Sequence, residues 1–98
     1  MTPRLFVRKV ARADMAEAFT WYEGRRVGLG HDFLDEVSHT FTAIEAQPQR
    51  FALAVDDIRM APLQRFPYVA YFVELPRHTS VIAVVHGRRS PRVWQRRR

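Results

Sequence analysis

Cationic and aromatic side chains make up the part of this sequence best equipped for chemistry. They fall between residues 59 and 94 and comprise Arg59, Arg65, Tyr68, Tyr71, His86, Arg88, Arg89, Arg92 and Trp94. Guanidinium groups bind phosphates and carboxylates through paired hydrogen bonds, and an adjacent aromatic ring can stack on a nucleobase. The set therefore predicts a surface that binds a polyanion or an acidic peptide segment.

The strands that carry these residues are expected to bring several of them together. Residues 68–75 and 79–86 are apolar, β-branched and aromatic runs separated by a turn, a pattern that predicts an antiparallel pair. The end of the second strand then lies beside the start of the first. We therefore expect the guanidinium groups of Arg65, Arg88 and Arg89 to converge at one edge of the sheet.

A structural interpretation is preferred for part of the set. Tyr68 and Tyr71 fit buried or half-buried strand positions, and the run Arg96 to Arg98 fits a frayed, solvated tail. A genomic bias toward arginine codons is an equal alternative for the excess of arginine along the rest of the chain. Only the three clustered arginines are expected to need a partner.

Most enzyme classes with a short signature are unsupported. The chain has no cysteine, which excludes disulfides, thiolate metal sites and a cysteine nucleophile. The pairs His31-Asp32 and Asp35-Glu36 have no second cluster at metal-ligand spacing, so we interpret them as a solvated helix face. No phosphate-binding glycine loop or GxSxG motif is present. We therefore predict no metal and no cofactor.

Length and charge limit the organisation of the chain and its partners. The 98 residues suit a single domain spanning 1–98. Sixteen basic residues, all but Lys9 arginine, exceed ten acidic ones and give a formal charge of +6, which favours binding to polyanions or to an acidic partner. Residues 87–98 form a basic C-terminal tail. The segment Met1 to Val10 lacks a signal-like apolar run, so a cytoplasmic location is expected.

Two helices are predicted in the first half of the chain. A strand is expected over Arg4 to Val10, with Lys9 on it, and Asp14 then has capping-box spacing to Glu17. The first helix should run from this cap to Gly28-Leu29-Gly30. The second should cover His31 to Ala46, ended by Pro48.

The second half is expected to form the rest of a sheet. Residues 51–55 and 58–66 should pair as a hairpin, with Pro62 marking an edge or a bulge. The strand 68–75 should be central, because its apolar content is nearly continuous. The predicted fold class is α+β, in the order β-α-α-β-β-β, with a small twisted, mostly antiparallel sheet and an αα-hairpin on one face.

The order of motifs over residues 4–96 resembles the RelE/ParE superfamily of bacterial toxins. The motifs are EAFTWYE, GLGHDFLDEV, IEAQPQRF, LQRFPY, VIAVVH and HGRRSPRVWQRR. The resemblance implies the toxin of a type II toxin–antitoxin system, with the fold expected above. It also implies a cognate antitoxin, ParD-like or similar, whose acidic and amphipathic segment docks between the helical hairpin and the sheet and on the arginine-rich edge.

The superfamily implies two activities, and the C-terminal sequence favours one of them. ParE-like members are implied to inhibit DNA gyrase without being enzymes. RelE-like members are implied to cut mRNA on the ribosome with lysines and a C-terminal tyrosine, whereas this chain has only Lys9 and places Trp94 at the matching position. An indole N–H is not an acid or base at neutral pH. A ParE-like toxin is therefore predicted, with target-binding residues Arg59, Arg65, Arg88, Arg89 and Trp94.

Two other functions remain open. In an mRNA endonuclease, His86 would act as the base with a carboxylate such as Glu45, and Arg88, Arg65 and Arg59 would supply positive charge. A third possibility is a basic nucleic-acid-binding module that poisons nothing, with strongly salt-dependent binding to arbitrary DNA or RNA.

Overall fold

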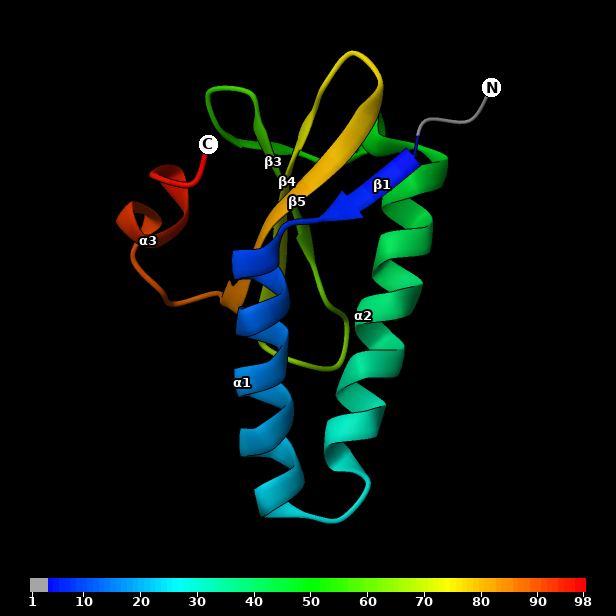
Figure 1. Ribbon diagram of the computed structural model, residues 1–98, viewed down its shortest axis with the longest axis vertical. Helices are drawn as coiled ribbons and strands as arrows, with labels where there is room; N and C mark the ends of the chain where they lie inside the picture. The colour runs from blue at the N-terminus through cyan, green and yellow to red at the C-terminus, as the bar shows by residue number, and fades with distance from the viewer. Residues whose placement is uncertain (1–3) are drawn as a thin grey trace.

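One five-stranded sheet with a helical hairpin on one face organises the computed structural model, which describes residues 4–98 (Figure 1). The strand order is β1-β5-β4-β3-β2. Residues 1–3, which belong to the predicted domain 1–98 and to the N-terminal segment Met1 to Val10, lie outside the described residues. The α+β class and the order β-α-α-β-β-β are confirmed.

The strands are mostly antiparallel, and a short C-terminal helix follows them. In chain order the elements are β1 (Arg4–Val7), α1 (Lys9–Arg25), α2 (Leu29–Ala46), the 3-10 turn η1 (Pro48–Arg50), β2 (Leu53–Val55), β3 (Ile58–Pro62), β4 (Tyr68–Glu74), β5 (His78–His86) and α3 (Pro91–Gln95). Among the strands of residues 4–98, only β1 and β5 pair in parallel. The helix α3 lies in the segment that the sequence predicted to be a basic tail.

The central pair β4 and β5 forms as predicted. Their register runs from Tyr68 opposite His86 to Glu74 opposite Thr79. A register shift after Tyr71 leaves Ile82 as an extra residue in β5, as in a β-bulge. This pairing places the end of β5 beside the start of β4, where the sequence predicted a functional edge.

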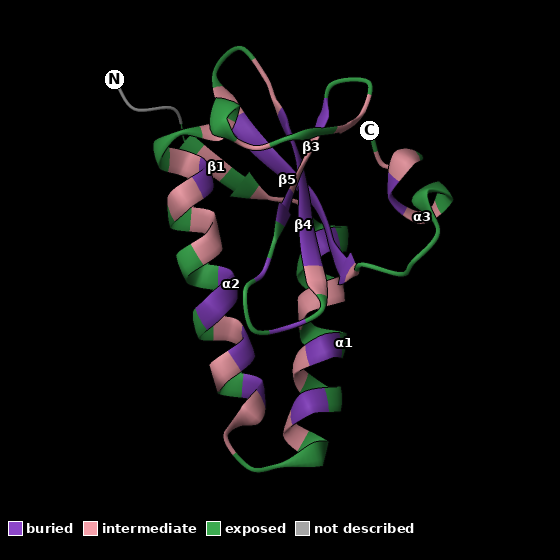
Figure 2. Cartoon of the chain, turned by 180° about the vertical axis from the view of Figure 1, so that it is seen from behind, coloured by how far each residue is buried: buried purple, intermediate pink, exposed green. Residues whose placement is uncertain are grey.

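Both faces of the sheet are covered (Figure 2). Phe33, Val37 and Ile44 of α2 pack on the face that contains Phe72 and Val84. The opposite face is built from residues such as Ile58, Val73 and Ile82, and Trp94 of α3 packs against it. Side chains on both sides of β4 and β5 are therefore buried, which explains why their sequences are almost uninterruptedly apolar.

The predicted N-terminal boundaries are wrong. The strand ends at Val7 rather than Val10, and α1 begins at Lys9 with no side-chain cap at Arg8. The earlier start buries Ala11 completely against the core. Asp14, predicted to cap the helix, lies inside it, and Lys9 is on the helix rather than on the strand. Short alternating runs fit a strand and a first helical turn equally well, so periodicity did not separate them.

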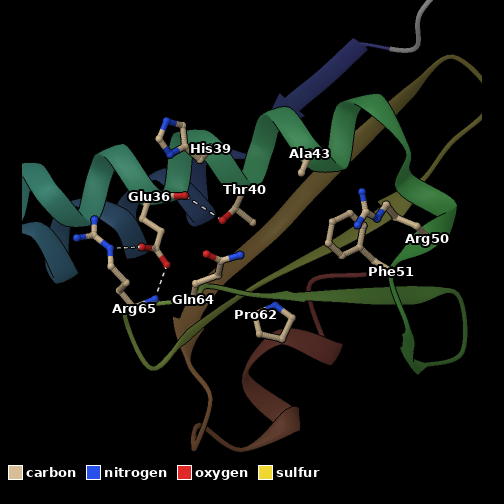
Figure 3. A pocket seen from close by; sticks show the side chains of 9 residues that line it. All are labelled: Glu36, His39, Thr40, Ala43, Arg50, Phe51, Pro62, Gln64 and Arg65. Atoms are coloured by element: carbon tan, nitrogen blue, oxygen red, sulfur yellow. Dashed lines mark hydrogen bonds and ion pairs between the residues drawn. The ribbon is translucent and has the colours of Figure 1, made fainter.

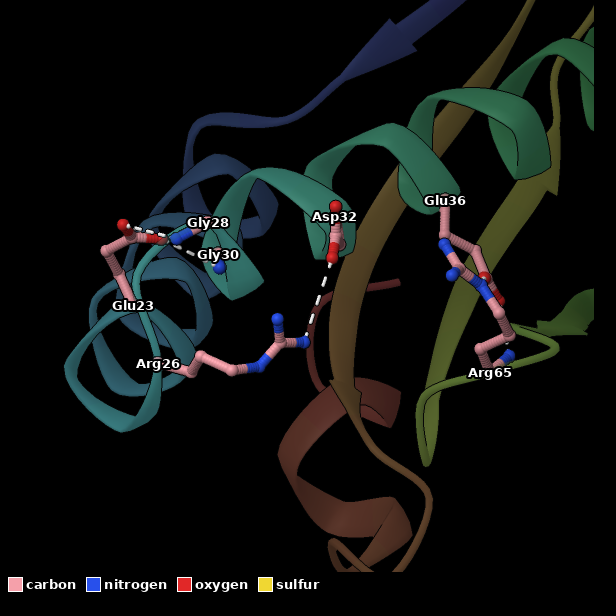
Figure 4. A network of polar contacts seen from close by, with 7 residues as sticks. All are labelled: Glu23, Arg26, Gly28, Gly30, Asp32, Glu36 and Arg65. Atoms are coloured by element: carbon pink, nitrogen blue, oxygen red, sulfur yellow. Dashed lines mark hydrogen bonds and ion pairs between the residues drawn. The ribbon is translucent and has the colours of Figure 1, made fainter.

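The turn between α1 and α2 is held by polar contacts (Figure 4). The predicted terminator Gly28-Leu29-Gly30 instead opens α2, because α1 already ends at Arg25. Gly28 has φ of 90°. The carboxylate of Glu23 accepts N–H bonds from Gly28 and Gly30, both at 2.9 Å. The bond from Gly28 is the main reason that the pKa of Glu23 is lowered.

Pro62 ends β3, which the sequence had extended to Phe66. It pairs with Val69 of β4, whereas β2 pairs only with the first two residues of β3. The proline therefore sits where β3 has a neighbour on one side only, in agreement with the predicted edge position.

Glu36 fixes the loop of residues 63–67 that joins β3 to β4 (Figure 4). Its carboxylate accepts the backbone N–H of Arg65 at 2.6 Å and the guanidinium Nε at 2.8 Å. Burial would raise the pKa of Glu36, but these bonds outweigh it and lower that pKa. The residue is only 8% exposed. Its assignment to a solvated helix face was therefore wrong.

The C-terminal residues are also tied down. The Asp14 carboxylate accepts the backbone N–H of Val84 at 3.0 Å and the Arg97 guanidinium at 2.6 Å. Arg98 pairs with Asp57 at 2.5 Å, and Arg8 donates to the Arg97 carbonyl. The prediction of a frayed tail is wrong for Arg97 and Arg98, because each finds a carboxylate that lies far away in the sequence.

We expect Glu36→Gln to lower the free energy of unfolding at neutral pH by roughly 1 to 2 kcal/mol, because the amide is a weaker acceptor for Arg65. A lowered folded-state pKa stabilises the fold above the ordinary glutamate pKa of about 4.3, and this contribution disappears as the pH falls through the folded-state pKa. Urea unfolding should show a difference from wild type at pH 7 that shrinks as the pH falls below about 4.3. If the difference in unfolding free energy does not depend on pH, or if the exposed control Asp35→Asn loses as much stability, the Glu36–Arg65 contact does not stabilise the fold in this way.

We expect Asp14→Ala to reduce the free energy of unfolding by about 2 kcal/mol, because it removes the acceptor of two part-buried donors. Hydrogen exchange at the Val84 amide should accelerate. The control Glu17→Ala, on the same helix, should change the stability by less than about 0.5 kcal/mol. If Asp14→Ala keeps the stability and the Val84 amide exchange rate of the wild type, the contacts of Asp14 with Val84 and Arg97 are not needed for the fold.

Candidate functional site

The predicted target-binding residues do not form one cluster. Arg59 lies on β3, where its guanidinium contacts the Glu74 carboxylate at 3.2 Å and the Phe51 carbonyl at 2.7 Å. Arg65 is held by Glu36 in the loop before β4. Both cations already have intramolecular partners, so Arg65, one of the three clustered arginines expected to need a partner, finds one in Glu36 of its own chain.

Trp94 is buried rather than displayed. Its ring stacks on Tyr71 with a centroid distance of 4.0 Å and an interplanar angle of 14°. It is 3% exposed, and its indole N–H has no hydrogen-bond partner among residues 4–98. Tyr71 is buried and Tyr68 is half-buried, as preferred from the sequence. With α3 in place, Trp94 cannot touch a partner, and its role in target binding remains a proposal that would require α3 to move.

The remaining predicted arginines lie in the segment from Gly87 to Arg92, which we call the basic turn. The Gly87 N–H donates to the Pro67 carbonyl at 2.8 Å, and the Arg89 N–H donates to the His86 carbonyl at 2.9 Å. Arg88 and Arg89 are exposed, and their guanidinium groups form no ion pair within residues 4–98. They are the predicted cations that the fold leaves available to a partner.

A small polar pocket adjoins the basic turn. It holds about 20 Å³, close to the space of one water molecule, and is lined by Asp14, Glu17, Tyr68, Val84, Val85, His86 and Arg89. The rings of Tyr68 and His86 meet edge-on, with centroids 5.6 Å apart. The pocket therefore joins α1, the two central strands and the basic turn.

Charges around the pocket act on the Tyr68 phenol. Burial raises the pKa of Tyr68, and the negative charge of Glu17 raises it further, while Arg89 opposes the change. The phenol is therefore a hydrogen-bond donor at neutral pH. Glu17 forms no hydrogen bond or ion pair through its side chain within residues 4–98. Sequence reasoning missed it as a site residue because it was assigned to a helix cap.

His86 is oriented by its own turn. The backbone N–H of Arg88 donates to its Nδ1 at 3.0 Å, so the neutral imidazole carries its proton on Nε2. The ring is thus arranged to donate a hydrogen bond through Nε2, while Nδ1 is already occupied as an acceptor. The suggested partner Glu45 is at the other end of the sheet, where it accepts the Leu5 N–H at 3.1 Å. Leu5 lies opposite Thr79, roughly 20 Å along β5 from His86.

A larger groove runs between α2 and β3 (Figure 3). It encloses about 470 Å³ and is lined by Glu36, His39, Thr40, Ala43, Arg50, Phe51, Pro62, Gln64 and Arg65. Arg50 projects over Phe51, while Glu36 is neutralised by Arg65. The groove therefore combines an apolar floor with exposed positive charge, which suits an extended acidic segment.

Metal binding and membrane insertion find no support in the part of the chain that the structure describes. Within residues 4–98, no three histidine, aspartate or glutamate side chains lie close enough together to hold a metal ion. Among the helices of the same residues, none has the length and apolar content needed to cross a bilayer.

Comparison with known proteins supports the fold. No family model matches the chain, and no curated protein sequence matches it. Among solved structures, it is similar to a chain from the chromosomal ParDE TA system from P. aeruginosa, with a TM-score of 0.76 and 16% sequence identity. The match covers 87% of this chain and 96% of that chain. At this identity the likeness shows a shared fold, in agreement with the architecture implied by the motifs.

Proposed function

We propose that this chain is the toxin of a type II toxin–antitoxin system and arrests growth by inhibiting DNA gyrase without catalysis. The observation that carries the proposal is its likeness to a chain of the ParDE system over nearly the full length of both chains. The motif order along residues 4–96 supports the same conclusion.

The basic turn is the part of the predicted target-binding set best placed for this role. Arg88 and Arg89 are exposed and unpaired within residues 4–98, whereas Arg59 and Arg65 already hold carboxylates. A desolvated guanidinium can contribute strongly to a protein interface when it meets a carboxylate. Arg88 and Arg89 are therefore the proposed contacts with gyrase, and Arg59 and Arg65 are proposed to support them by fixing the sheet and the loop before β4.

Neutralisation requires an antitoxin, and the groove between α2 and β3 offers it a site. The apolar floor at Ala43, Phe51 and Pro62 and the cation of Arg50 suit an acidic, amphipathic segment that folds on binding. The antitoxin is proposed to be ParD-like, and a cytoplasmic location follows from the proposed target. The groove and the basic turn involve different elements, so the two partners are proposed to use different contacts.

We expect the double substitution Arg88→Ala and Arg89→Ala to abolish growth arrest in cells that express the chain without an antitoxin, because it removes the two exposed cations of the basic turn that belong to the predicted target-binding set. Growth after induction should be measured at matched protein levels. The control pair, Arg12→Ala and Arg77→Ala, removes the same charge from exposed positions on other elements and should remain toxic. Continued toxicity of the basic-turn variant, with normal folding, would contradict the assignment.

An mRNA endonuclease is the second candidate, and the polar pocket is the observation that favours it. Cleavage through the RNA 2′-OH needs a group that takes its proton and donors that stabilise the phosphorane. Glu17 could take the 2′-OH proton, Arg89 and the His86 Nε2–H could stabilise the phosphorane, and the neutral Tyr68 phenol could protonate the leaving 5′-oxygen as its bond to phosphorus breaks. In this candidate Glu17 replaces Glu45, and His86 is a donor rather than the base.

For this candidate, His86→Ala should abolish mRNA cleavage on ribosomes while leaving the fold intact, because His86 is half-buried at the last position of β5, outside its buried run. Primer extension on a translated message would map the cuts. An unchanged cut pattern in His86→Ala would exclude this role, and the absence of any cut with the wild-type chain would exclude the candidate.

A further inference from the structure

An exposed tryptophan lies on the flank of α1 that leads away from the basic turn. Trp21 is 55% exposed, and the guanidinium carbon of Arg25 lies 4.3 Å from the centroid of its ring. The ring also meets Tyr22 edge-on, with centroids 5.1 Å apart. These contacts restrict the orientations of the indole, which lowers the conformational entropy that is lost when a partner covers it.

This flank is continuous with the polar pocket. Glu17, Trp21 and Arg25 follow one another at intervals of four residues, which places them on one face of the helix. Glu17 lines the polar pocket together with Arg89 of the basic turn. A surface therefore runs from Arg89 across Glu17 to Trp21 and Arg25, and we call it the α1 flank.

The rest of the helical hairpin keeps the α1 flank rigid. Glu23 binds the N–H groups of Gly28 and Gly30, and Arg26 lies 4.0 Å from Asp32 (Figure 4). A side chain at Gly30 would clash with Phe19, because a Cβ there would lie 2.7 Å from its ring. The two helices are thus packed closely at the turn, and the nearby acids are occupied by their own contacts.

We infer that the α1 flank is part of the surface that binds the toxin's target, with Trp21 as its aromatic anchor. The inference rests on the proposed function, and it supplies the exposed aromatic that the buried Trp94 does not provide. Tryptophan and arginine are the residue types most enriched at the energetic centres of protein interfaces. The target patch should offer an apolar side chain for Trp21, a carboxylate for Arg25 and a cation for Glu17.

The α1 flank carries both positive and negative side chains, and this mixture favours a protein over a nucleic acid as its partner. Glu17 stands between Arg89 and Trp21 on this surface and has no side-chain partner within residues 4–98. A phosphate backbone that contacted Arg89 and Arg25 would pass over this carboxylate and be repelled by it. A protein surface can present a positive group at that point, so it satisfies all three side chains.

The test compares Trp21→Ala with Leu53→Ala, which truncates an apolar side chain of similar exposure, 58%, on β2. Inhibition of DNA supercoiling by purified gyrase holoenzyme and growth arrest are both measured, at equal thermal stability of the variants. We expect Trp21→Ala to weaken inhibition at least about tenfold and Leu53→Ala to leave it unchanged. Unchanged inhibition and toxicity in Trp21→Ala would overturn the inference while leaving the gyrase proposal standing.

The remaining outcomes separate the inference from the proposed target. If the wild-type chain stops growth but does not inhibit gyrase, gyrase is not the target. Loss of growth arrest in Trp21→Ala would then still support the inference that the α1 flank binds the target. A wild-type chain that never arrests growth overturns both. Binding of the chain to a duplex DNA probe is measured as well. If Trp21→Ala lowers this binding and toxicity to the same extent, the α1 flank binds a nucleic acid, and the proposal of a protein partner is overturned.

Discussion

The carboxylate of Asp14 is the contact on which the arrangement of this molecule depends. It accepts the Val84 N–H of β5 and the guanidinium of Arg97, so one side chain joins the first helix, a central strand and the C-terminus. The tail fixed in this way carries Trp94 onto Tyr71 and closes the second face of the sheet. It also holds in place the end of β5, from which the basic turn begins.

Intramolecular pairing explains why a net charge of +6 does not translate into one uniformly basic surface. Arg59, Arg65 and Arg97 each hold a carboxylate, and Arg59 and Arg97 also donate to backbone carbonyls. The planar guanidinium has several N–H donors in fixed positions, so it binds a carboxylate and a carbonyl at the same time better than a lysine ammonium does. Exposed charge is left for partners at the basic turn, at Arg50 in the groove and on the α1 flank, where glutamate, tryptophan and arginine follow one another.

Local pattern sufficed to predict the helical hairpin and the central strands, because long apolar runs and a 3.6-residue period report burial directly. The tail was not predictable in this way, since Arg97 finds Asp14 across 83 positions in the sequence. One signal was available there, because Ser90 before Pro91 is typical of a helix start. Glu36 had a signal as well, because it lies three residues after the buried Phe33 and next to Val37 on the helix stripe.

The most direct test of the proposed function is to express the chain inducibly without an antitoxin and to follow chromosome breaks and global translation at early times. The gyrase proposal predicts chromosome cleavage and an SOS response while translation continues. A prompt stop in translation with cut mRNA and an intact chromosome would contradict it and place the activity in the polar pocket between Glu17, Tyr68 and His86.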